Sequence, residues 1–77
     1  MNKEFNINKL AEAWSSPLVT RSQQQLDKFS GGLLNARTLA NADSLGIGPK
    51  GRVKFGRKVA YDKYALVEYL RSKMEAA

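Results

Sequence analysis

The side chains in this sequence that could do chemistry are mostly cations, and most of the surplus positive charge lies in one segment. Between Ser44 and Tyr61 there are five cations and no acid, so this segment supplies +5 of the formal net charge of +6. The five are Lys50, Arg52, Lys54, Arg57 and Lys58. Such a block can neutralise a polyanion, and on a small domain it favours nucleic acid as the partner. An anionic membrane surface is the second choice.

Residues suited to catalysis or metal binding are scarce. The chain contains no histidine and no cysteine, which excludes disulfides, zinc fingers, thiolate nucleophiles and histidine bases. Its seven carboxylates show no local spacing typical of a metal loop or a catalytic pair. We therefore expect no enzyme activity, no metal, no cofactor and no small-molecule ligand.

The length and composition leave room for one small domain. The 77 residues are 43% apolar and 26% charged, which is ordinary usage for a soluble globular protein. No stretch reaches the roughly 20 apolar residues that cross a membrane, and no signal-peptide pattern is present. We expect a cytoplasmic protein without a membrane partner. The whole chain, 1–77, is predicted to be one domain, with a lead-in segment at 1–19 and its core at 20–74.

Two helices joined by a glycine turn are predicted ahead of the basic segment. The first runs from about 21 to 29, starts at a capping-box signature of Thr20 and Gln23, and ends at Gly31-Gly32. The second runs from 36 to 45, with Asn35 as its N-cap. Two helices connected in this way form a helix-turn-helix, whose second helix can enter a DNA major groove.

The second helix has two different faces. The stripe that can pack inward consists of Thr38, Leu39, Ala42 and Leu45. The opposite face is short-chained and polar, and consists of Arg37, Ala40, Asn41 and Ser44. Asp43 lies on its flank and is the only acid near it.

A β-hairpin is predicted at 52–61, because apolar residues there alternate with a period of two. A two-residue loop, Gly56-Arg57, would pair Phe55 with Lys58, whereas a three-residue loop would pair Phe55 with Val59. We favour the longer loop, since it separates one apolar face from one basic face. A hairpin directly after a DNA-contacting helix is a wing, whose cations would meet phosphates or the minor groove.

The two ends of the chain complete the domain. A last helix is predicted from about 63 to 74, with Asp62 as its cap. Its expected inward positions are Leu66, Tyr69, Leu70 and Met74. In the lead-in segment, Asn8 could cap a short helix, and Trp14 is predicted to be a core residue.

Four runs of this sequence resemble the excisionase-type, MerR-like winged-helix proteins of phages and integrative elements. The runs are Leu34–Asn41, Leu45–Pro49, Val53–Tyr61 and Leu66–Leu70. The resemblance covers about residues 20–70, and implies an α+β fold: a small winged helix-turn-helix with about three helices and a two-stranded wing. It also implies that Arg37, Thr38 and Asn41 face the major groove, and that Lys54, Arg57 and Lys58 belong to the wing.

The expected function is sequence-specific binding of double-stranded DNA. The candidate contacts on the helix are Asn35, Arg37, Thr38, Ala40, Asn41 and Ser44, and those on the wing and its approach are Lys50, Arg52, Lys54, Arg57 and Lys58. The resemblance implies an excisionase, or recombination directionality factor, that acts with further copies of itself on tandem sites and with a tyrosine integrase. Two alternatives remain: a transcriptional regulator of a mobile element with the same fold, and a protein-interaction module with a basic docking face.

Overall fold

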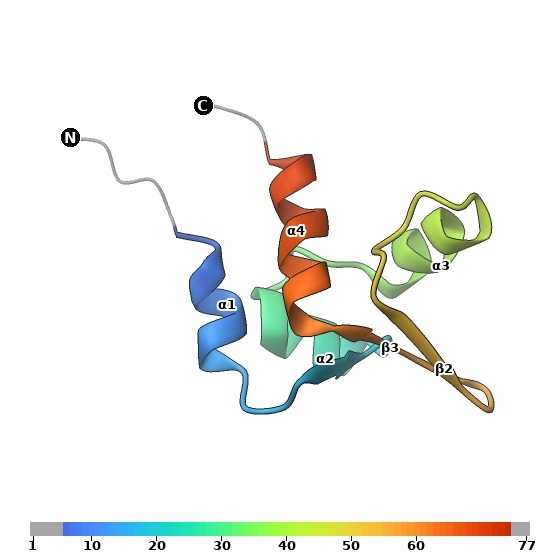
Figure 1. Cartoon of the computed structure of the whole chain (residues 1–77), viewed down its shortest axis with the longest axis horizontal. Helices are drawn as coiled ribbons and strands as arrows, with labels where there is room; N and C mark the ends of the chain where they lie inside the picture. Colours follow the sequence, from blue (N-terminus) through green and yellow to red (C-terminus); the bar gives the residue numbers. More distant parts are fainter. Residues whose placement is uncertain (1–5, 75–77) are drawn as a thin grey trace.

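The computed structural model describes residues 6–74, which form four helices and a three-stranded antiparallel sheet (Figure 1). In chain order the elements are α1 (Asn8–Ala13), β1 (Leu18–Thr20), α2 (Gln23–Ser30), α3 (Ala36–Ser44), β2 (Arg52–Phe55), β3 (Lys58–Asp62) and α4 (Lys63–Lys73). The predicted α+β winged arrangement is confirmed, since a helix-turn-helix (α2–α3) precedes a hairpin (β2–β3) and a last helix. The strand β1 was not predicted.

Local hydrogen bonds explain where the helices begin. The Asn35 side chain accepts from the Thr38 N–H at 3.0 Å and caps α3, as predicted. The Asp62 carboxylate likewise accepts from the N–H groups of Tyr64 and Ala65 and caps α4. These two caps confirm the starts of both helices.

The start of α2 differs from the prediction, because Thr20 belongs to β1 and not to a capping box. Thr20 pairs with Ala60 in the sheet, and the cap is Ser22, whose hydroxyl accepts from the Gln25 N–H at 3.3 Å. The Gln23 side chain accepts instead from the Ala36 N–H at 2.8 Å. It also donates to the Leu34 carbonyl at 3.0 Å, so it holds α2 against the start of α3.

The described part of the predicted lead-in segment, residues 6–19, belongs to the folded domain. Ile7, Ala11 and Val19 are buried, so the core extends further toward the N-terminus than its predicted start at residue 20. Trp14 is half-buried against Phe29, with the two rings edge to face at 5.5 Å. Asn8 does not cap α1, because it lies inside that helix and the N-cap position is Ile7.

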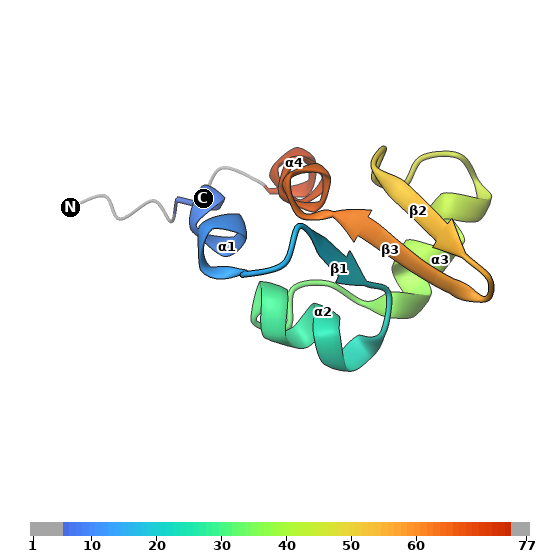
Figure 2. The ribbon, with the colours of Figure 1, turned by 60° about the horizontal axis from the view of Figure 1, so that its bottom comes forward.

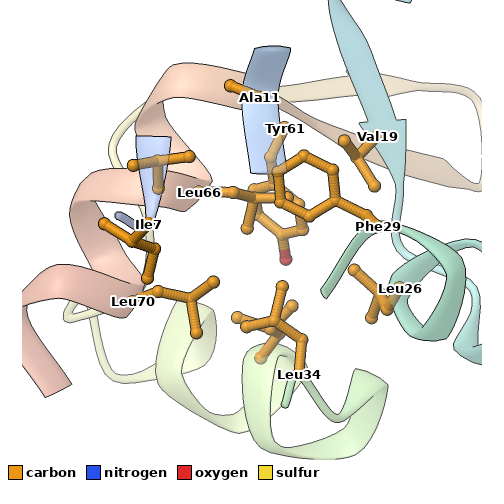
Figure 3. Close-up of a cluster of buried hydrophobic side chains, with 11 residues drawn as sticks. Ile7, Ala11, Val19, Leu26, Phe29, Leu34, Tyr61, Leu66 and Leu70 are labelled. Carbon is orange, nitrogen blue, oxygen red and sulfur yellow. The ribbon is translucent and has the colours of Figure 1, made fainter. Parts of the chain in front are cut away.

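The sheet has the order β1-β3-β2, so β3 is the central strand (Figure 2). On one side of it Val19 pairs with Tyr61, and on the other side Arg52 pairs with Tyr61. The central position leaves Tyr61 with no exposed surface, and Figure 3 shows its ring in the middle of the buried cluster. The four helices supply most of the other side chains of this core, and Val19 of β1, Leu34 of the α2–α3 turn and Ile7 complete it.

The hairpin has the two-residue loop, so the predicted three-residue loop is wrong. Phe55 pairs with Lys58 and Lys54 pairs with Val59, while Gly56 adopts the left-handed conformation (φ 60°) that such a tight turn favours. The prediction assumed that both strands had an apolar face to bury. All four residues of β2 are exposed, so the strand gains little from sorting its apolar residues to one face.

The inward stripe of α3 is narrower than predicted. Leu39 and Ala42 are buried, whereas Thr38 is exposed and Leu45 keeps 72% of its surface exposed. In α4, Leu66 and Leu70 are buried as predicted and Tyr69 is half-buried, but Met74 is exposed. Helix α3 therefore rests on the core along one edge and presents most of its surface to solvent.

Replacing Leu39 by alanine should lower the free energy of unfolding by about 2–5 kcal/mol, because a buried side chain of this size leaves a cavity. Leu39 is 1% exposed and is the larger of the two buried residues of α3. The control is Leu45→Ala at the end of the same helix, which should change stability by less than about 0.5 kcal/mol. Urea unfolding followed by circular dichroism measures both. Equal losses would contradict this account of how α3 is anchored.

Candidate nucleic-acid interface

Helix α3 and the β2–β3 hairpin, called the wing below (residues 52–62), lie at the same end of the molecule. Figures 1 and 2 show them together, away from α1. The predicted outward face of α3 does face solvent, since Arg37, Asn41 and Ser44 are exposed and Ala40 is half-buried. The predicted cations of the wing and its approach are all exposed. One surface therefore combines a polar helix face with a cationic hairpin.

A groove of about 440 Å³ separates α3 from the wing. Its lining residues are Ala40, Asp43 and Ser44 from α3, Lys54, Gly56, Arg57, Val59 and Arg52 from the wing, and Arg21 from the turn before α2. Because side chains alternate along a strand, Arg52 and Lys54 share the side of the sheet on which Val59 and Tyr61 lie. The register thus turns two cations of β2 toward α3.

The structure brings some of the predicted residues together and separates others. Those that border the groove are Ala40, Ser44, Arg52, Lys54 and Arg57. On α3 but outside the groove lining are Arg37, Thr38 and Asn41, with Asn35 at the N-terminus of the helix. Lys50 lies on the connection before β2, and Lys58 lies on the side of the wing that faces away from Arg52 and Lys54.

Asn35 and Thr38 are occupied by the local structure of α3. The Asn35 Oδ1 atom accepts from the Thr38 N–H at 3.0 Å and from the Thr38 hydroxyl at 3.3 Å. Both side chains therefore hold the start of the helix in place, and Arg37 and Asn41 are exposed polar side chains on the outward face.

Asp43 connects α3 to the rest of the interface. Its Oδ2 atom accepts from the Arg21 guanidinium at 2.9 Å and from the Tyr61 hydroxyl, and the Arg52 guanidinium lies 3.9 Å away. The Asp43 side chain is only 5% exposed. The one acid that lines the groove is thus paired with cations from two other segments, which limits its repulsion of an anionic ligand.

The sequence analysis missed Arg21 and Tyr61 as parts of the site, and it placed Asp43 only on the flank of α3. Arg21 and Asp43 are 22 positions apart, and Tyr61 and Asp43 are 18 apart. No local spacing rule connects residues at such separations. The one signal was the isolated acid beside an otherwise acid-free helix face.

The connection from α3 to β2 depends on glycine where it passes Asp43. A Cβ atom at Gly48 would lie 2.0 Å from the Asp43 Oδ1 atom, so any side chain there would displace the carboxylate. The connection also includes buried Pro49. Gly48 therefore lets the connection pass directly beside the Asp43 carboxylate.

The environment of Tyr61 changes its acidity. Burial and the hydrogen bond to Asp43 raise the pKa of the Tyr61 hydroxyl to about 12. The pKa of Arg21 is also raised, chiefly by its hydrogen bond to Tyr61. The phenol is therefore a neutral hydrogen-bond donor, and the guanidinium a permanent cation, at every physiological pH.

The described residues, 6–74, contain no group of three or more carboxylates that could hold a metal ion. Over the same range, no helix has the length and apolar character needed to cross a membrane. No protein-family model, curated protein or solved structure matches this chain.

Replacing Tyr61 by phenylalanine should lower the free energy of unfolding by about 1–3 kcal/mol at neutral pH, because Asp43 loses a donor in a buried site. The folded pKa is about 12 against an ordinary value of 10.0, so the folded state holds this proton more tightly than the unfolded state. The stabilisation is complete below pH 10 and is lost between pH 10 and 12. Unfolding in urea at neutral and alkaline pH should show the difference between the two proteins shrinking above pH 10.

Tyr64→Phe is the control for this measurement, because Tyr64 is 61% exposed. Removal of the Tyr64 hydroxyl should leave stability nearly unchanged at neutral pH. A difference between wild type and Tyr61→Phe that is the same at neutral pH and above pH 10 would contradict the account of the Tyr61 pKa.

Proposed function

We propose that this protein binds double-stranded DNA sequence-specifically, with α3 in the major groove and the wing on the neighbouring backbone and minor groove. One observation carries the proposal: one edge of the polar face of α3, at Ala40 and Ser44, borders the same groove as three wing cations. These cations are Arg52, Lys54 and Arg57. Asp43, the one acid among the groove's lining residues, is paired with Arg21. A duplex fits this surface because it offers phosphates to the cations and base edges to the helix.

The side chains of the surface divide between specificity and affinity. Arg37 and Asn41 are exposed one helical turn apart on α3. Arginine can bond the major-groove edge of guanine and asparagine that of adenine, each good pair supplying about 1–3 kcal/mol of discrimination. Lys54, Arg57 and Arg52 would neutralise phosphates, which strengthens binding to all sequences alike.

The size of the surface favours several copies on one site. A single module of this kind buries about 600–1,000 Å² of protein surface on DNA, which is a small footprint. Useful specificity then requires neighbouring copies or a partner protein. This need agrees with the role that the sequence resemblance implies, an excisionase whose tandem copies shape an attachment site for a tyrosine integrase. Such a protein would act in the cytoplasm of a bacterial cell.

Two alanine variants should separate the contact roles. Arg37→Ala should relax base preference at one position of the site, with a loss of about 1–3 kcal/mol for the preferred base only. Lys54→Ala should weaken binding to all duplexes alike and reduce the slope of log K against log salt by about one. Fluorescence anisotropy with selected and scrambled duplexes over a salt series measures both effects.

Lys28→Ala is the matched control for the loss of charge, because Lys28 is an exposed lysine of α2, outside the groove lining. It should leave the salt slope nearly unchanged. An Arg37→Ala protein with intact base preference would show that α3 does not contact the bases through this residue.

Genomic DNA from the source organism tests the biological role. We would capture sheared DNA with the purified protein at physiological salt and sequence the retained fragments. Closely spaced repeats at the junction of an integrated element are the expected result for an excisionase. An operator over a promoter, without an attachment site, would favour transcriptional regulation. No enrichment of any duplex would overturn the proposed DNA binding. Binding of an acidic protein in a separate capture experiment would then favour a protein-docking role.

A further inference from the structure

The packing of the fold does not explain why the Phe55 ring is exposed to solvent. Phe55 keeps 81% of its surface exposed, more than any other large apolar residue among the described residues. It is the last residue of β2, directly before the loop at the tip of the wing, and Figures 1 and 2 show this tip projecting away from the helices α1, α2 and α4. A ring at this position contributes nothing to the core.

The register of the hairpin holds Phe55 in solvent. Phe55 pairs with Lys58 and alternates with Lys54, so its ring lies on the side of the wing away from Val59 and Tyr61. The three-residue loop would have paired it with Val59. The two-residue loop is tight, with Gly56 in the left-handed conformation, and ladder pairs hold the strands on both sides of the tip. The ring is thus carried on ordered strand structure.

The charges around Phe55 identify the kind of partner that can cover it. The charged side chains at the tip, Lys54, Arg57 and Lys58, are all cations. A neutral apolar surface of another protein would have to desolvate these cations as it covered the ring. Duplex DNA offers both components that the tip requires, since phosphates line the edges of the minor groove and apolar base faces become accessible when a base step opens.

We propose that Phe55 acts as a wedge: it enters the minor groove at the wing and partly unstacks one base step, which kinks the duplex. The inference rests on the proposed DNA binding and adds a deformation and a source of specificity to it. Apolar side chains inserted in this way bend DNA toward the major groove, the side that α3 would occupy. Pyrimidine–purine steps open most easily, so the protein should prefer TA or CA/TG steps under the wing tip without a hydrogen bond to those bases.

The test uses the full chain and a pool of duplexes that the wild-type protein has selected from a random-sequence library. Bending is measured by energy transfer between dyes at the duplex ends, and unstacking by the fluorescence of 2-aminopurine at the step under the wing. The wild-type protein should bend the selected duplex by about 20° or more. Phe55→Ala should lose the bend and the 2-aminopurine signal, with affinity falling about tenfold.

Two matched variants show whether insertion of the side chain is the cause. Phe55→Leu should keep part of the bend, since leucine also serves as a wedge. Val53→Ala, which removes an apolar side chain from the same side of the wing but further from the tip, should bend DNA as the wild type does. The salt slope of Phe55→Ala should equal that of the wild type, because no cation is removed. Its melting temperature should also be unchanged, because the ring is outside the core.

Each result that differs has a definite meaning. Wild-type bending by Phe55→Ala would overturn the wedge while leaving the proposed DNA binding intact. Weaker self-association of Phe55→Ala in sedimentation, with unchanged bending, would also overturn it, since the ring would then be a contact between copies. If the wild-type protein selects no duplex at all, the proposed function fails, and the wedge fails with it.

Discussion

The Tyr61 hydroxyl is buried where the sheet meets α3, and a buried hydroxyl requires a hydrogen-bond partner. Its partner is the Asp43 carboxylate, which also accepts from Arg21. This one contact joins the central strand, the exposed helix and the turn before α2. Because α3 otherwise meets the core mainly through Leu39, the contact sets how the helix lies beside the wing. The shape of the groove between them depends on it.

The wing has a different physical basis from the rest of the fold. Of the two strands of the wing, only β3 contributes to the core, while every residue of β2 is exposed. A hairpin in this position is held by its ladder and its tight turn, and its side chains are left available for contacts with a partner. The strand turns Arg52 and Lys54 toward α3 and leaves Phe55 on the opposite side. The two sides of the wing therefore differ in chemistry.

Much of the fold could be predicted because the determining contacts are local. The caps at Asn35 and Asp62 and the glycine end of α2 involve residues within a few positions of one another. Their hydrogen bonds depend little on the remainder of the chain. The exposed face of α3 followed from helical periodicity for a similar reason. The length of the hairpin loop could not be predicted in this way, because the apolar pattern favours one register only where the strand has a face to bury.

The sequence by itself determined the class of fold, the starts of α3 and α4, the glycine end of α2 and the placing of the positive charge, since each depends on neighbouring residues. The tertiary structure alone decided that residues near Val19 complete the sheet, that Asp43 pairs with Arg21 and Tyr61, and that Phe55 is left in solvent. Each of these features depends on which groups, far apart in the chain, are buried together. The free energy gained or lost by this burial arises only once the segments have packed together, so no local pattern of residues encodes it.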